Sequence, residues 1–170
     1  MTTESTPLNV LFLCTHNSAR SVLAEALLNS MGAGRFKAFS AGSSPRANQQ
    51  PHPLGLQVLQ KAGISVDGLR SKSWDEFATP DAPAMDLIIT VCDNAAGEVC
   101  PIWPGHPATA HWGYADPSEG SASDEEKLEA FRQTMHLIKR RLELLIQLPA
   151  EKLEKERLQT TARELSREVA

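Results

Sequence analysis

Residues 8–28 read LNVLFLCTHNSARSVLAEALL, and this stretch decides the fold. It opens with a run over residues 8–13 that is apolar except for Asn9, and this run has the length and composition of a strand buried on both faces. After a short polar loop, apolar residues return at helical spacing in SVLAEALLNSMG, and Gly32 or Gly34 can close this helix. A buried strand followed by a loop and a helix is typical of a parallel α/β sheet.

The rest of the chain repeats this alternation. Further strands are expected over residues 36–42, 85–91 and 109–114. The segment HPLGLQVLQKAGI predicts a helix with Pro53 in its first turn, and SWDEF predicts a helical turn that starts at Ser73. A long helix is expected from Ser123 to Pro149, because apolar residues recur there at steps of three and four. The pattern predicts an open, mostly parallel four-stranded sheet flanked by helices, with a C-terminal helical tail.

The bulk composition limits the function classes. A chain of 170 residues with 41% hydrophobic residues predicts one domain, over residues 1–148, with residues 149–170 as a helical or frayed extension. A net charge of -4 disfavours nucleic-acid binding. No apolar run approaches the length of about 18 residues of a membrane span, and the polar N-terminus does not resemble a signal peptide. We therefore expect a cytoplasmic protein, with a monomer favoured.

The chain has three cysteines, an odd number that is too small for a secreted disulfide scaffold. Their expected role is reactivity. Cys14, Cys92 and Asp116 each follow the end of an expected strand. Because ligands of parallel sheets bind at the carboxyl ends of the strands, we expect these three residues to meet at one edge.

The six-residue step from Cys14 to Arg20 predicts an oxyanion site. A loop that leads into a helix N-terminus points several backbone N–H groups at a bound anion. Arg20 adds a planar, permanently charged clamp for the same anion. The candidate oxyanion-binding residues are Thr15, His16, Asn17, Ser18, Ala19, Arg20 and Ser21.

The same positive field activates the cysteine. A thiol with a pKa near 8.5 is about 3% ionised at pH 7, whereas a pKa of about 6.5 ionises roughly three-quarters of it. Asn17 tolerates a left-handed backbone and is expected to fix the shape of the loop. Ser21 is expected to donate a hydrogen bond to the Cys14 thiolate.

Simpler interpretations remain for several of these residues. A Cys-x5-Arg spacing arises by chance in roughly one such chain in six, and buried inert cysteines are common. His16 is either an exposed loop residue, which we favour, or a group that tunes Cys14. Cys92 and Cys100 could form a zinc site with His106 and His111, but Cys-x7-Cys lacks the short ligand spacing of such sites, so no metal is expected.

LFLCTHNSARSVLAEALL, together with ADP at residues 115–117, resembles the low-molecular-weight protein tyrosine phosphatase family and the arsenate reductases that share its loop. The resemblance implies that Cys14 is the nucleophile, that Arg20 binds the oxyanion and that Asp116 is the general acid. The phosphatases carry a second cysteine in the loop, where this chain has Ala19, and aromatic residues after the Asp-Pro, where this chain has SEG. Both departures favour a small inorganic substrate.

The second chemical step separates the two activities. A phosphatase uses water, whereas a reductase needs another thiolate to attack the sulfur of the first cysteine. Cys92 is the candidate for that thiolate, and Cys100 can carry the oxidation onward; VCDNAAGEVCPIWPGHPATAHWG resembles the redox segment of the arsenate reductases. We predict an arsenate reductase without a tightly bound cofactor, recycled by thioredoxin or by glutathione and glutaredoxin, for which phosphate and sulfate are substrate mimics. A low-molecular-weight tyrosine phosphatase is the alternative, and an oxyanion-binding redox sensor is a third possibility.

Overall fold

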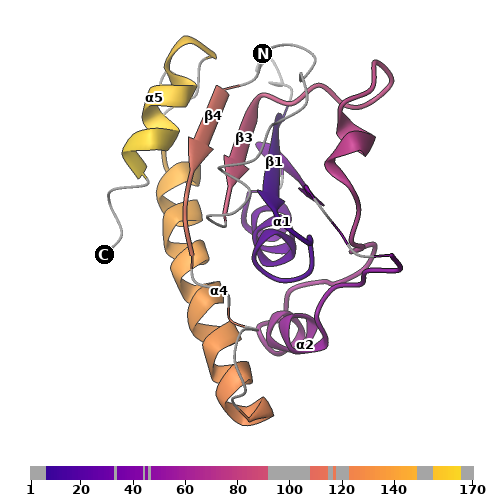
Figure 1. Cartoon of the computed structure of the whole chain (residues 1–170). Coiled ribbons are helices and arrows are strands. Elements are labelled where there is room, and N and C mark those ends of the chain that lie inside the picture. The colour runs from indigo at the N-terminus through magenta and orange to yellow at the C-terminus, as the bar shows by residue number, and fades with distance from the viewer. Residues whose placement is uncertain are drawn as a thin grey trace.

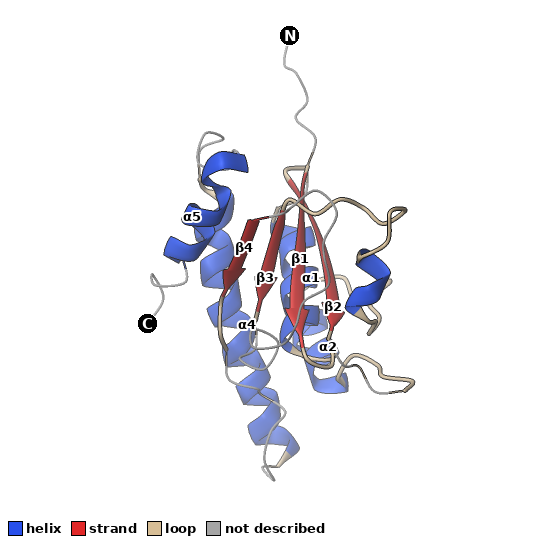
Figure 2. Cartoon of the chain, turned by 45° about the horizontal axis from the view of Figure 1, so that its top comes forward, coloured by secondary structure: helices blue, strands red, loops and turns tan. Residues whose placement is uncertain are grey.

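The computed structural model contains one parallel sheet with helices on both sides (Figures 1 and 2). Among the residues that it describes, none of the helices has the length and apolar character needed to cross a membrane. The described residues are 7–32, 34–43, 45, 47–91, 108–114, 117, 123–148 and 155–165.

The sheet has four parallel strands in the order β2-β1-β3-β4. Their bounds are β1 Leu8–Cys14, β2 Phe36–Gly42, β3 Leu87–Thr90 and β4 Ala108–His111. In this register Cys14 lies opposite Gly42 on β2, and Leu13 lies opposite Thr90 on β3. The expected four-stranded, mostly parallel α/β sheet is confirmed.

Three helices cover one face of the sheet. They are α1 (Arg20–Met31), α2 (Pro53–Lys61) and α4 (Asp124–Ile146), and Figure 2 shows them behind the strands. The short 3-10 helix η1 (Trp74–Phe77) belongs to the segment on the other face. The C-terminal helix α5 (Lys155–Leu165) lies beside β4 at one edge of the sheet (Figure 1).

The alternation of side chains along β1 explains both layers. Val10 and Phe12 point into the larger core, which is shared with α1, α2 and α4. Leu11 and Leu13 point into a smaller core on the opposite face, with Trp74 and other residues of the η1 segment. Both faces of β1 are buried from Val10 to Cys14, and this part of the strand is apolar, as its sequence predicts.

Two strands are shorter than expected. Residues 85–91 and 109–114 predict longer strands than β3 and β4, although Trp112 still donates its backbone N–H to Thr90 (2.8 Å) and Tyr114 donates to Val91 (3.2 Å). Met85 and Tyr114 are buried next to the ladder rather than within it. The apolar pattern therefore predicts which residues are buried but overestimates the length of the strands. Buried residues continue beyond the residues that pair with a neighbouring strand.

Candidate functional site

Cys14 is the last residue of β1, and Arg20 is the first residue of α1. Residues 15–19 form the connecting loop at the carboxyl edge of the sheet, and Cys14 is only 3% exposed. Asn17 has a backbone φ of 56°, the left-handed conformation that its residue type predicts. The expected loop between a strand and a helix N-terminus is therefore present.

The N-terminus of α1 has neither a side-chain cap nor an acidic residue of its own first turn. Ala19, at the N-cap, makes no side-chain capping hydrogen bond, and the first turn contains no acidic residue. The first backbone N–H groups of a helix have no intrahelical acceptor, and the helix dipole favours negative charge at this end. This end of α1 therefore has the polarity that an oxyanion site requires.

Asn17 connects the loop to two other segments. Its Nδ2 donates to Ser21 Oγ (2.8 Å), and its Oδ1 accepts from the backbone N–H of Lys72 (2.9 Å). The Ser71 hydroxyl donates to the carbonyl of Asn17. Asn17 and Ser21 are fully buried, so the hydrogen bond between their side chains is shielded from water. The Ser21 oxygen accepts from Asn17, which leaves its hydroxyl proton for donation to an acceptor.

The end of β2 lies directly beneath the loop. A Cβ atom added to Gly42 would stand 2.7 Å from the carbonyl oxygen of Thr15, 2.9 Å from the carbonyl carbon of His16 and 3.0 Å from the nitrogen of Asn17. Ser43, the next residue, donates its backbone N–H to the carbonyl of Cys14 (3.1 Å). Only glycine allows the two backbones to approach this closely.

The start of α2 supports the loop from another side. His52, the N-cap of α2, donates its backbone N–H to the carbonyl of Ser18 (2.8 Å), and its Nδ1 accepts from Leu54 (3.2 Å). His16, for which we favour an exposed position from the sequence, is half-buried. The loop is therefore held by β2, by α2 and by the segment before η1.

Arg20 reaches toward the chain that follows β4. Its Nη1 donates to the carbonyl of Tyr114 (2.9 Å), two residues before Asp116. The structure thus joins Cys14, Arg20 and the segment leading to Asp116 at one edge of the sheet. Asp116, Cys92, Cys100 and His106 lie outside the described residues. Within the described part of the chain, no group of three or more His, Cys, Asp or Glu side chains could hold a metal ion.

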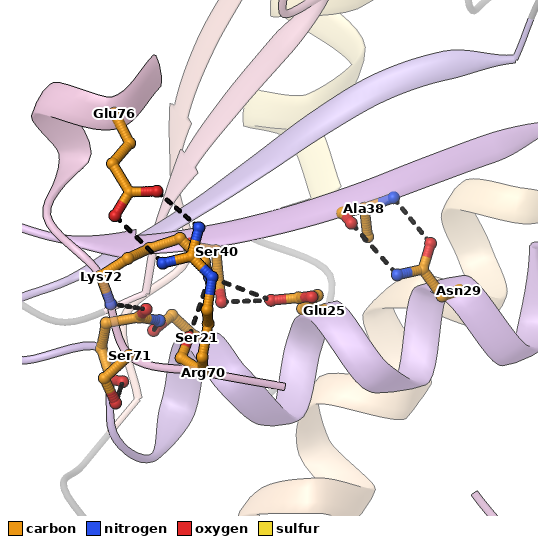
Figure 3. A network of polar contacts seen from close by, with 10 residues as sticks. Ser21, Glu25, Asn29, Ala38, Ser40, Arg70, Ser71, Lys72 and Glu76 are labelled. Atoms are coloured by element: carbon orange, nitrogen blue, oxygen red, sulfur yellow. Dashed lines mark hydrogen bonds and ion pairs between the residues drawn. The ribbon is translucent and has the colours of Figure 1, made fainter. Parts of the chain in front are cut away.

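A buried network of charges lies behind the loop (Figure 3). Lys72 donates from Nζ to the carbonyls of Ser40 (2.7 Å) and Arg70 (2.9 Å), and this Nζ lies 3.9 Å from Glu25 Oε1. The Ser40 hydroxyl also donates to Glu25 Oε1. The side chains of Lys72 and Glu25 are only 8% and 15% exposed. Lys72 therefore holds α1, β2 and the segment before η1 together, and its own backbone N–H holds Asn17.

Burial acts on both charges of this network. It raises the pKa of Glu25, against the opposing effects of the Ser40 hydrogen bond and the Lys72 charge. Burial likewise lowers the pKa of Lys72, and the negative charge of Glu25 opposes this shift. Each charge is thus costly to bury and needs the other as its partner.

We expect Lys72→Met to lower the free energy of unfolding by about 2–4 kcal/mol, because the carbonyls of Ser40 and Arg70 and the carboxylate of Glu25 lose their cation. Denaturant unfolding measures this loss. Lys139→Met, at an exposed position of α4, is the matched control and should stay within about 0.5 kcal/mol of the parent. Combining Lys72→Met with Glu25→Gln should cost less than the sum of the two single changes. Strict additivity would show that the pair is not coupled.

Several residues of this site were not identified from the sequence: His52, Gly42, Ser71, Lys72 and Tyr114. All of them contact the loop or Arg20, and all are distant from it in sequence. Gly42 alone carried a readable signal, a glycine at the end of an expected strand. The other contacts join residues that are far apart along the chain, and no local sequence pattern predicts them.

Relatives with known names match most of the chain. The family model described as low molecular weight phosphotyrosine protein phosphatase matches residues 9–159. An arsenate reductase of Halalkalibacterium halodurans is 32% identical over 133 residues, which cover 78% of this chain and 91% of that protein. A glutaredoxin arsenate reductase of Synechocystis sp. is 29% identical, over 81% of this chain and 95% of that protein.

Solved structures agree with these relatives. An arsenate reductase in a phosphate-binding state superimposes with a TM-score of 0.65 at 29% identity, over 82% of this chain and 96% of that one. A thioredoxin-dependent arsenate reductase of Corynebacterium glutamicum has a TM-score of 0.56 at 30% identity, over 84% of this chain and 65% of that one. The loop geometry, the sheet order and these matches lead to one conclusion: the chain belongs to the low molecular weight phosphotyrosine protein phosphatase family, as one of its arsenate reductase-like members.

Proposed function

We propose that this protein reduces arsenate to arsenite with Cys14 as the nucleophile. The Cys14 thiolate attacks arsenic(V), a sulfur–arsenic bond forms, and one arsenate oxygen leaves as water after protonation. The loop amides and Arg20 hold the remaining oxygens. The open N-terminus of α1 and the buried position of Cys14 support this role.

The second step of the proposal uses Cys92. Its thiolate attacks Sγ of Cys14, a Cys14–Cys92 disulfide forms, and the electron pair of the sulfur–arsenic bond goes to arsenic, which leaves as arsenite. The observation that carries this step is the strand register. Val91, the residue before Cys92, donates its backbone N–H to the carbonyl of Leu13, the residue before Cys14 (2.8 Å).

Recycling then requires an external dithiol or thiol. In our proposal the Cys100 thiolate attacks Sγ of Cys92, which releases Cys14 and leaves a Cys92–Cys100 disulfide. Thioredoxin, or glutathione with glutaredoxin, reduces this disulfide without a tightly bound cofactor. Relatives of both kinds support a thiol donor, since one is named a glutaredoxin arsenate reductase and another a thioredoxin-dependent one. Such chemistry needs reduced thiols, which supports a cytoplasmic location in our proposal.

Asp116 is the proposed general acid that protonates the leaving oxygen. The hydrogen bond from Arg20 to the carbonyl of Tyr114 supports this role, because it ties the oxyanion clamp to the segment that leads to Asp116. A phosphatase would use the same nucleophile, oxyanion-binding group and general acid, namely Cys14, Arg20 and Asp116. Only the fate of the Cys14 adduct separates the two activities.

Steady-state arsenate reduction tests the proposal. Arsenite formation is measured with thioredoxin and its reductase, and separately with glutathione, glutaredoxin and glutathione reductase. We expect arsenate-dependent turnover with one of these systems. Hydrolysis of p-nitrophenyl phosphate without arsenite formation would establish a phosphatase instead. Disulfide formation with oxidant, but turnover with neither oxyanion, would indicate a redox sensor.

We expect Cys92→Ser to lower steady-state arsenite formation by at least about tenfold, because the Cys14 adduct then depends on an external thiol for its second step. Phosphate affinity should remain that of the parent, since serine changes only the attacking atom. Isothermal calorimetry with phosphate therefore serves as the internal control for folding. Parent-like turnover by Cys92→Ser would refute the relay.

A further inference from the structure

The C-terminal helix α5 covers the open edge of β4 (Figure 2). Arg163 donates from Nε to the carbonyl of Thr109 (3.1 Å) and from Nη2 to Thr109 Oγ1 (3.4 Å). Ala162 and Leu165 are buried in the larger core. The family model ends at residue 159, before these contact residues. These contacts of α5 are therefore made by residues that lie beyond the range matched by the family model.

One of these contacts reaches a tryptophan behind the candidate site. Trp112 Nε1 donates to the carbonyl of Ala162 on α5 (2.9 Å), and the Trp112 side chain is fully buried. The backbone N–H of the same residue donates to the carbonyl of Thr90 (2.8 Å). Trp112 is thus held by α5 through its ring and by β3 through its backbone.

Tyr114, two residues after Trp112, contacts Arg20, the candidate oxyanion-binding residue. Tyr114 donates its backbone N–H to Val91 (3.2 Å), and its carbonyl accepts from Arg20 (2.9 Å). Arg141 of α4 lies over both rings of this segment, 4.9 Å from the Tyr114 ring centroid and 6.0 Å from that of Trp112. Residues 112–114 are therefore fixed from α4, α5 and β3, and they present one carbonyl to Arg20.

We propose that α5 is a positioning element of the oxyanion site and that Trp112 is its positioning residue. The Ala162 carbonyl holds the indole, the indole holds residues 112–114, and the Tyr114 carbonyl orients the Arg20 guanidinium toward the anion. This inference rests on the proposed role of the loop and Arg20 in oxyanion binding. A planar guanidinium binds an oxyanion through two parallel hydrogen bonds, so its orientation matters as much as its charge.

The first test is Trp112→Phe in the full chain, which keeps a buried aromatic ring and removes the N–H donor. Phosphate is the probe, and its Kd is measured by calorimetry well below the melting temperature. We expect Kd to rise by about threefold to tenfold, because a small misplacement of a binding group weakens its contacts. For arsenate, KM should rise by a similar factor with kcat within about twofold, the pattern of lost uniform binding.

Arg163→Met loosens α5 from β4 and should weaken phosphate binding in the same direction. Ile88→Val, in the smaller core on the other face, is the control for lost stability and should leave Kd unchanged. If Trp112→Phe and Arg163→Met lowered the melting temperature with an unchanged Kd, α5 would have only a structural role, and the inference would be wrong.

A double-mutant cycle identifies the route of the effect. In an Arg20→Lys background, Trp112→Phe should have little further effect on phosphate affinity, because the guanidinium that it orients is gone. A full effect in that background would overturn the inference while leaving the proposed function intact. If Arg20→Ala bound phosphate as tightly as the parent does, the oxyanion site itself would be refuted, and this inference with it.

Discussion

Cys14→Ser should abolish arsenate reduction, with a loss of at least about 10³-fold in turnover. A serine hydroxyl has a far higher pKa than a thiol and is not ionised in the field of the loop. It also cannot form the disulfide that returns two electrons to arsenic. The variant thus loses both the nucleophile and the redox centre, and arsenite formation with the active thiol donor measures the loss.

The same variant should keep its binding site. Serine is close to cysteine in size, and the loop amides, Arg20 and Gly42 are unchanged. We expect the Kd for phosphate to stay within about threefold of the parent, because the anion is held by groups other than the sulfur. Arsenate turnover by Cys14→Ser would contradict the whole mechanism. Lost phosphate binding would show instead that the substitution disturbs the loop.

Gly42→Ala should have the second largest effect on arsenate turnover, after Cys14→Ser. The new methyl group would stand within 3.0 Å of three backbone atoms of residues 15–17, which cannot move aside as a flexible side chain can. We expect the free energy of unfolding to fall by about 1–3 kcal/mol, as in other overpacked cores. Displacement of the loop should also lower kcat/KM for arsenate by about 10²-fold, because reacting groups tolerate little misplacement.

Gly34→Ala is the matched control for this substitution. Gly34 has a φ of 91°, and a Cβ atom there would meet nothing within 4 Å. The control therefore strains the backbone by about 1 kcal/mol without touching the loop. Denaturant unfolding and phosphate calorimetry on both variants separate the two effects. If Gly42→Ala bound phosphate and turned over arsenate like Gly34→Ala, the close packing of β2 against the loop would have no functional role.

Local patterns account for most of the fold. The apolar run of residues 8–13 marks β1 because this strand is buried on both faces from Val10 to Cys14. The three- and four-residue spacing after Ser123 marks α4, and Ser123 does cap this helix by accepting from the backbone N–H of Glu126 (3.2 Å). Strand lengths were overestimated for β3 and β4, since apolar character reports burial and pairing needs a neighbouring strand.

The sequence by itself determined the α/β alternation, the Cys-x5-Arg loop and the left-handed Asn17, because each depends on residues adjacent along the chain. Only the tertiary structure decided what holds that loop: Gly42 beneath it, Lys72 behind it and Tyr114 opposite Arg20. These residues lie between 28 and 100 positions from Cys14, and their roles arise from strand order and register. The residue types of a short stretch determine its local conformation and its chemistry. The position of one backbone segment against another depends on how the whole chain packs.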